Sequence, residues 1–264
     1  MSATAVSPPL APAPVATGSA GRLTRRRAAL VAGFGYLAIF VLALFANFVV
    51  LEGLVVADDG EATVANIADD TALFRAGLVA FLVVFVLDVV IAWALHVVFR
   101  DREPDLSRLA AWLRLTYTAF LGVGLVAFFV VLQLVGGAEH LAAFDPDQIA
   151  SQAMLALDAF EAAWLIGLVA FGLHLVVVGW MILRTGAASP LLGWLLTVAG
   201  TAYMIDTAAH AVLPGYDDLA GLFLALVAVP SVVAELWLGI WLLRGGGGRR
   251  VAPDERSETT ALAA

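Results

Sequence analysis

Eight ionisable side chains lie inside long apolar stretches of this 264-residue chain. Five are charged residues and three are histidines: Asp88, Arg114, Glu161, Asp206, Glu235, His96, His174 and His210. If these stretches cross a membrane, a charge near the centre costs about 2.5 to 3.5 kcal/mol. We therefore expect these side chains to face the interior of a helix bundle or water, where they could carry protons or bind ions.

The buried acids outnumber the bases that could neutralise them. Four carboxylates accompany Arg114, and even with Arg75 at the edge of a span, two carboxylates have no arginine partner. Counted at about 1.5 Å per residue, Arg114 and Glu235 lie at similar depths, so we expect them to pair. An unpartnered carboxylate in an apolar interior must bind a proton, a cation or a histidine. The sequence thus predicts an intramembrane polar network of Asp88, Arg114, His174, Asp206 and Glu235.

A second group of ionisable residues is expected near the outer surface of the membrane: Arg75, Asp158, Glu161 and His210. Asp206 and His210 are four residues apart and would share one helix face. Carboxylate and imidazole ligands suit zinc or a harder cation, but two helices would have to bring them together. The chain shows no known spacing for a metal site, a phosphate loop or a nucleophilic triad. We predict neither a metal site nor a cofactor, and catalytic residues stay unassigned.

Composition shows which elements must position these groups. Hydrophobic residues make up 62% of the chain and charged residues 14%, with a mean hydropathy of +0.96. Soluble domains contain roughly 45 to 50% apolar residues. Six apolar segments are long enough to cross a hydrocarbon core of about 30 Å: 28–51, 76–99, 109–134, 157–183, 190–212 and 219–243. We therefore predict an all-α fold, a polytopic membrane bundle of six transmembrane helices.

Two helix starts are marked by capping residues and proline. Asp145 precedes Pro146, and Gln148 lies at the position that completes a capping box. Ser189 precedes Pro190 in the same arrangement. Both sites predict a helix that begins at the proline.

Six spans place both chain ends on the same side of the membrane. Twelve of the 14 basic residues, all arginine, lie in the tails and in the loops on that side. Positively charged loops stay in the cytoplasm, so the sequence predicts cytoplasmic termini and a location in the cell membrane. Segments 1–21 and 245–264 are predicted to be disordered cytoplasmic tails on either side of a transmembrane domain at 22–244.

Charge and cysteine content exclude several classes of protein. The net charge of −8 argues against nucleic-acid binding. The chain has no cysteine, which excludes disulfides and thiol chemistry. The expected partners are the lipid bilayer and a small ion or small-molecule substrate, and the oligomeric state stays open.

Several short motifs, in order and at consistent spacing, resemble the bacterial domain of unknown function 4386 family. The resemblance covers about residues 22 to 245 and implies a six-helix integral membrane protein. It implies no activity, because no reaction or substrate is established for the family. The motifs are Asn66-Ile67, Phe74-Arg75-Ala76-Gly77, Asp88-Val89-Val90-Ile91-Ala92, Ala110-Ala111-Trp112-Leu113-Arg114-Leu115, Phe171-Gly172-Leu173-His174-Leu175, Pro190-Leu191-Leu192-Gly193, Tyr203 to Asp206, and Ala234-Glu235.

Three functions are compatible with these residues. The first is a proton- or cation-coupled transporter that uses its intramembrane carboxylates, because the polar residues are distributed across the bilayer as a relay requires. The second is a membrane scaffold or accessory subunit, in which the polar residues only hold helices together. The third is a membrane-embedded, metal-dependent enzyme built on Glu161, Asp206 and His210. The sequence favours a function other than catalysis.

Overall fold

The computed structural model describes residues 24–137 and 139–246, and every regular element in these ranges is a helix. Six helical segments are long and apolar enough to span a membrane, which confirms the predicted all-α bundle of six transmembrane helices. The predicted tail 1–21 lies outside the described residues. So does the predicted tail 245–264, apart from its first two residues.

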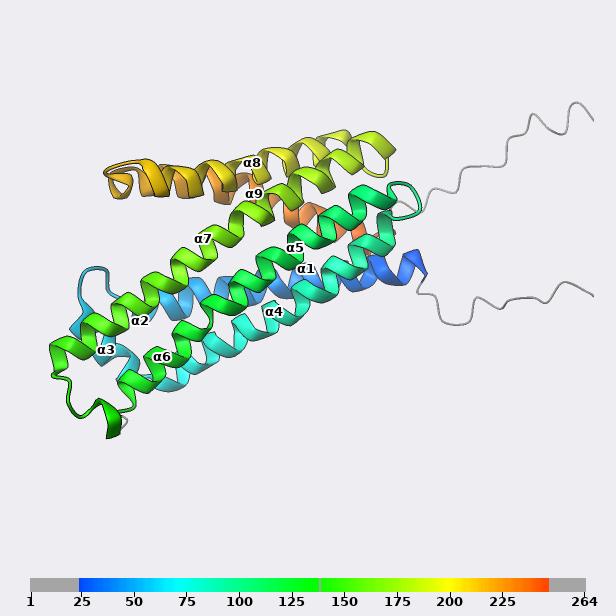
Figure 1. Ribbon diagram of the computed structural model, residues 1–264. Helices are drawn as coiled ribbons and strands as arrows, with labels where there is room; N and C mark the ends of the chain where they lie inside the picture. The colour runs from blue at the N-terminus through cyan, green and yellow to red at the C-terminus, as the bar shows by residue number, and fades with distance from the viewer. Residues whose placement is uncertain (1–23, 138, 247–264) are drawn as a thin grey trace, which may run out of the picture.

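Some spans contain more than one helical element, and short helices join the spans at one end of the bundle (Figure 1). We call this the far end, and we call the opposite end, where α1 begins and α9 ends, the terminal end. In chain order, the elements are α1 (Arg25–Leu44), the π-helix η1 (Phe45–Leu51), α2 (Glu52–Leu54), α3 (Gly60–Asp69), α4 (Thr71–Phe99), α5 (Pro104–Gly124), α6 (Val126–Val135), η2 (Glu139–Leu141), α7 (Pro146–Thr185), α8 (Pro190–Val212), η3 (Tyr216–Leu219) and α9 (Ala220–Leu243).

Both predicted proline helix starts are confirmed, but they are capped differently. Asp145 and Gln148 form the expected capping box, in which Asp145 Oδ1 accepts from the Gln148 amide at 2.9 Å. The Ser189 hydroxyl makes no capping bond, contrary to expectation. The Leu192 amide, which that hydroxyl would serve, donates instead to the backbone carbonyl of Ser189 at 3.0 Å.

The six spans form a ring in chain order. Each span packs against the next one along the chain, and α9 closes the ring by packing against α1. Antiparallel neighbours with short connections produce this arrangement, which needs no long crossover. The ring leaves a shared interior to which every span can contribute side chains.

Glycines allow α7 and α8 to pack very closely. A Cβ atom on Gly172 would meet the carbonyl oxygen of Gly200 closer than real Cβ atoms come, and the same holds for Gly179 against Gly193. Lipid tails are as apolar as leucine, so helices in a membrane associate through such close packing. This seam fixes α8 against α7.

α1 and α9 meet at the terminal end of the bundle. Arg26 Nη1 donates to the carbonyl oxygen of Leu243 at 2.8 Å, and Gly33 lies directly against the Leu243 side chain. Gly239 in turn packs against the Cβ of Tyr36. The ring is therefore closed between these two helices near the chain ends.

Candidate functional site: a polar cavity between the six spans

Arg114 on α5 forms a buried ion pair with Asp88 on α4. Arg114 Nε donates to Asp88 Oδ1 at 2.8 Å, and Arg114 Nη2 lies 2.5 Å from the same oxygen. Both side chains are about 1 to 2% exposed, so lipid and bulk water are excluded from the pair. Removing one partner from such a pair would leave an uncompensated buried charge.

The remaining donors of Arg114 reach two other helices. Nη1 donates to the Tyr36 hydroxyl on α1 at 2.8 Å and lies 3.4 Å from His174 Nε2 on α7. His174 Nδ1 lies 2.8 Å from the carbonyl oxygen of Ala110. Because a carbonyl can only accept, Nδ1 must carry the hydrogen, and in a neutral ring Nε2 then accepts from Arg114. Arg114 thereby ties α1, α4, α5 and α7 together.

The expected pairing of Arg114 with Glu235 is not formed, because Asp88 takes that place. Counting residues placed Asp88 and Arg114 about 9 Å apart in depth. That count began at Arg108, but α5 begins at Pro104. Asp88 lies 11 residues before the end of α4, and Arg114 lies 10 residues after Pro104, so their depths match. The count also could not show which helices are neighbours, and α4 lies next to α5 in the ring.

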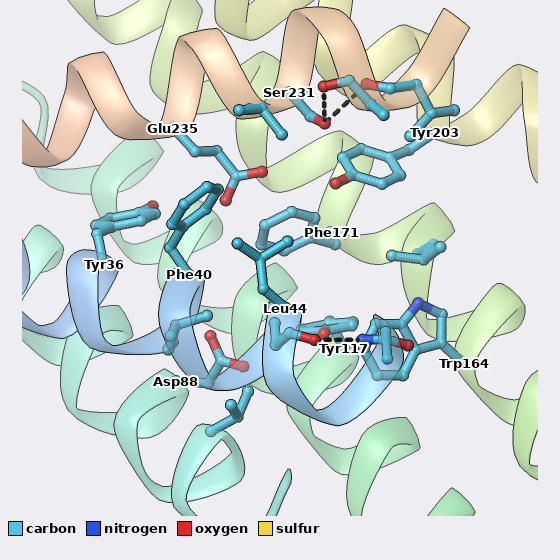
Figure 2. A pocket seen from close by; sticks show the side chains of 18 of the residues that line it. Tyr36, Phe40, Leu44, Asp88, Tyr117, Trp164, Phe171, Tyr203, Ser231 and Glu235 are labelled. Atoms are coloured by element: carbon cyan, nitrogen blue, oxygen red, sulfur yellow. Dashed lines mark hydrogen bonds between the residues drawn. The ribbon is translucent and has the colours of Figure 1, made fainter. Parts of the chain in front are cut away.

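A cavity of about 470 Å³ lies inside the ring, and all six spans contribute to its wall. Asp88, Arg114 and Glu235 line it together, at positions contributed by α4, α5 and α9. Figure 2 shows the carboxylates of Asp88 and Glu235. His174 does not line it, but it contacts two residues that do, Arg114 and Phe171. Apolar and aromatic side chains make up most of the remaining wall.

Glu235 is held differently from Asp88. It is half-buried on α9, and within the described part of the chain no ion pair reaches it. The hydroxyl of Tyr203 on α8 is directed toward Glu235 and Ser231 (Figure 2). The Ser231 hydroxyl donates to the carbonyl oxygen of Val227 at 2.7 Å, one turn earlier in the helix. Glu235 therefore has polar neighbours but no fixed cation.

Three mid-span tyrosines belong to this site and were missed by sequence reasoning. Tyr36, Tyr117 and Tyr203 all line the cavity, as do Trp164 and Phe171. Tyrosine usually concentrates at the membrane surface, where its hydroxyl meets water. A tyrosine near the middle of a span was therefore the signal that could have pointed to a polar interior.

The cavity opens between α1 and α9 toward the far end. Phe48 and Leu224 belong to its wall, yet they are 52% and 59% exposed on the outer surface of the bundle. The π-helix η1 supplies Phe48 and Asn47 to this wall, and π-helical segments are frequent at functional sites. Glu52, at the end of the same span, lies at the rim of the cavity.

Asp206 and His210 each contact Tyr216 at the far end, apart from the cavity. The Tyr216 hydroxyl donates to Asp206 Oδ1 at 2.6 Å, and the rings of His210 and Tyr216 lie 4.6 Å apart. Neither Asp206 nor His210 lines the central cavity. The structure therefore splits the polar network expected from the sequence: Asp88, Arg114, His174 and Glu235 meet around the cavity, and Asp206 lies apart from them.

The expected outer cluster is not assembled. Arg75, Asp158, Glu161 and His210 are all exposed, and Arg75 lines a different hollow beside Gln133. No ion pair joins these four residues within the described ranges. In residues 24–137 and 139–246, no group of three or more histidine, aspartate or glutamate side chains could hold a metal ion. The four residues lie on three helices, α4, α7 and α8, and similar depth does not bring side chains on different helices together.

Comparison with known proteins places these features in a family. The family model for a domain of unknown function, DUF4386, matches residues 31–246. An uncharacterized protein of Archaeoglobus fulgidus is 25% identical over 169 residues, which is 64% of this chain and 83% of the relative. No solved structure matches the chain.

Proposed function

This chain belongs to the DUF4386 family, a domain of unknown function, and we propose that it is a proton- or cation-coupled carrier whose binding site is the central cavity. One observation carries the proposal. A cavity shared by all six spans contains a neutralised pair, Asp88 with Arg114, and two further carboxylates, Glu235 and, at the rim, Glu52, neither of which forms an ion pair among the described residues.

The charges in the cavity favour an exchangeable cation. Asp88 and Arg114 cancel each other and are locked by hydrogen bonds to neighbouring helices. The Tyr203 hydroxyl lies beside Glu235, and the charge of Arg114 acts on Glu235 without forming an ion pair with it. A proton or cation on Glu235 would lower the remaining cost of its charge within the membrane. Because no ion pair among the described residues holds Glu235, the bound species can leave and be replaced.

The shape of the cavity fits one state of such a carrier. It opens between α1 and α9 toward the far end, while contacts of Arg26 and Gly33 with Leu243 close the same pair of helices at the terminal end. A carrier must expose its site to one side at a time, with the site near the middle of the membrane. The opposite state would require α1 and α9 to part near the chain ends.

A scaffold or accessory role is the second candidate, and the bonds of Arg114 favour it. They join four helices through buried contacts, as expected of polar residues that hold a bundle together. This role accounts for Asp88, Arg114 and His174. It does not account for a carboxylate in the wall of an open cavity.

The metal-dependent enzyme has the least support of the three functions. It needed Glu161, Asp206 and His210 to converge on one ion. Glu161 is exposed on α7, and Asp206 is bound to Tyr216.

Ion movement into proteoliposomes tests the carrier. The purified protein would be reconstituted with an internal pH-sensitive dye, and a potassium diffusion potential would drive protons inward, with and without external sodium. We expect protein-dependent acidification, slowed about tenfold by Glu235→Gln, because this change removes the exchangeable charge. Glu161→Gln is the matched control, since it neutralises an exposed carboxylate outside the cavity and should leave the rate unchanged.

Two results would overturn the carrier. One is a folded Glu235→Gln protein that moves protons or sodium at the parent rate. The other is the absence of any protein-dependent movement of protons, sodium or potassium, which would leave the scaffold as the better account. Elution of each variant as a single species in size-exclusion chromatography shows that it is folded.

A further inference from the structure

Aromatic rings form a continuous surface inside the cavity. Tyr117 and Phe171 have ring centroids 4.9 Å apart, Tyr117 and Trp164 6.3 Å, and Phe171 and Tyr203 5.5 Å. These four side chains come from three different helices and all line the cavity (Figure 2). The faces of such rings carry partial negative charge and attract cations.

The guanidinium group of Arg114 already lies against part of the aromatic wall. The guanidinium carbon of Arg114 lies 4.9 Å from the ring centroid of Tyr36 and 5.3 Å from that of Phe171. No other cation–π contact occurs within the described ranges, so no side-chain cation lies over Trp164, Tyr117 or Tyr203. Tyr203 lies beside Glu235 (Figure 2), so this aromatic surface can take a cation supplied by a ligand near that carboxylate.

The ionisable groups in the wall favour a cation over an anion. Three carboxylates, Glu52, Asp88 and Glu235, accompany a single arginine. Of the five N–H groups of Arg114, four are directed to Asp88, Tyr36 and His174. An incoming anion would therefore find at most one free donor and would face Glu235.

The entrance favours a ligand with an apolar body. The cavity opens past Leu44 and Phe48 on one side and Leu224 and Val232 on the other, and all four are exposed apolar side chains. Its volume of about 470 Å³ lies in the range of sites for small organic molecules. An inorganic cation alone would not need so large and so apolar a space.

We infer that the cavity binds a lipophilic organic cation, an amine or quaternary ammonium group on an apolar body, which enters from the bilayer between α1 and α9. The cationic group lies between Glu235 and the faces of Trp164, Tyr117 and Tyr203, and the apolar body fills the space toward Phe48 and Leu224. This inference rests on the proposed function, because it names the substrate class of the same cavity.

Equilibrium binding of tetraphenylphosphonium to the full chain in lipid nanodiscs tests the inference. Tetraphenylborate has the same shape and the opposite charge, so it controls for partitioning into lipid, as do nanodiscs without protein. We expect saturable binding of the cation and no saturable binding of the anion. Equal binding of both ions, or no saturable binding of the cation, would overturn the inference.

Variants locate the bound cation. Glu235→Gln should raise the dissociation constant about tenfold or more, and Glu235→Asp should retain part of the affinity. Trp164→Leu should also weaken binding, and Trp164→Phe should restore much of it. Trp180→Leu is the matched control, because Trp180 lies on the same helix, exposed and outside the cavity. Parent affinity in folded Glu235→Gln and Trp164→Leu proteins would contradict the assigned position.

The organic cation could be a free molecule or the head group of a lipid, and the same measurement separates the two. Tetraphenylphosphonium binding would be compared in nanodiscs of phosphatidylglycerol alone and in nanodiscs that also contain phosphatidylcholine. Competition by phosphatidylcholine identifies a choline head group as an occupant. Unchanged binding identifies the free cation as the ligand.

The two proposals fail in different ways. Saturable tetraphenylphosphonium binding without any coupled ion movement would overturn the carrier and retain the cation site. Proton movement that depends on Glu235, without cation binding, would retain the carrier and overturn the substrate class.

Discussion

The two sides of the central cavity hold their charges in opposite ways. On the side of α4, α5 and α7, Arg114 and Asp88 are almost fully buried, and Tyr36 and His174 occupy further donors of Arg114. On the side of α8 and α9, Glu235 has hydroxyl neighbours and no ionic partner among the described residues. The first arrangement holds helices together, and the second leaves a charge that a ligand can neutralise.

Packing also differs around the ring, between α7 with its contact to α8 and the two helices, α1 and α9, beside the mouth of the cavity. In the most apolar stretch of α7, 61% of the residues are buried, against 22% in the corresponding stretches of the α1 and α9 spans. The α7–α8 seam is closed by paired glycines, whereas α1 and α9 separate around the mouth of the cavity. Regions with few buried contacts open most readily. We therefore expect α7 and its neighbours to stabilise the fold and α1 and α9 to move.

Arg114→Leu should have the largest effect on stability. It leaves Asp88 charged and buried without a partner, which costs about 3 to 5 kcal/mol. Thermal unfolding in detergent, followed by circular dichroism, measures the loss. The double variant Asp88→Leu with Arg114→Leu should recover much of it, since both charges are then gone. If Arg114→Leu alone has the same melting temperature as the parent, Arg114 does not hold the helices together, and the two sides of the cavity do not differ as described.

Gly200→Ala tests the close packing of α7 against α8 without touching a charge. The added methyl group would meet the backbone of Gly172, so α7 and α8 must move apart, at a cost of about 1 to 3 kcal/mol. Gly221→Ala on α9 is the matched control, because nothing lies within 4 Å of the position of its added Cβ atom. Melting temperatures of both variants decide the point, and equal values would contradict the close contact.

Tyr216→Phe removes the hydrogen bond to Asp206, which lies outside the cavity. The bond is short, at 2.6 Å, and only partly buried, so its loss should cost about 1 kcal/mol. The same variant should leave tetraphenylphosphonium binding unchanged. A change in that binding would show that the Asp206 contact and the cavity are coupled, contrary to their separation here.

Glu235→Gln should not destabilise the protein, because no ion pair is broken and the cost of a charge within the membrane is removed. This result, beside the large loss expected for Arg114→Leu, would confirm that the two sides differ. Both variants would be compared by thermal unfolding in the same detergent. A loss for Glu235→Gln as large as that for Arg114→Leu would place Glu235 among the residues that hold the bundle together.

Glu61→Gln should have the smallest effect, visible only in the dependence of stability on pH. A hydrogen bond to Asp147 and the negative charge of Asp147 raise the pKa of Glu61, which lies on α3 outside the spans. The folded protein therefore binds this proton more tightly than the unfolded chain does. Its contribution to stability is present below the ordinary pKa of glutamate and is lost as the pH rises through the raised value. Between the ordinary pKa of glutamate and the raised pKa of Glu61, the melting temperature should fall less steeply with rising pH for the variant than for the parent.

Much of the architecture was predictable because membrane insertion imposes simple rules on sequence. Long apolar segments with few charges must be helices, since backbone groups in lipid have no other hydrogen-bond partners. The six spans follow directly, and the costly charges at Asp88, Arg114 and Glu235 indicated a polar interior before any contact was known. The capping box at Asp145 was equally local and was confirmed.

Partner choice was decided only by the tertiary structure. Depth along a span can be counted from the sequence, but the direction of each side chain around its helix and the neighbour of each helix cannot. Arg114 therefore pairs with Asp88 rather than Glu235, and Asp206 pairs with Tyr216 outside the cavity. The sequence determined which residues must avoid lipid, because that cost depends on residue type and depth. The packing of six helices decided which of them meet, because contacts depend on rotation, tilt and side-chain length.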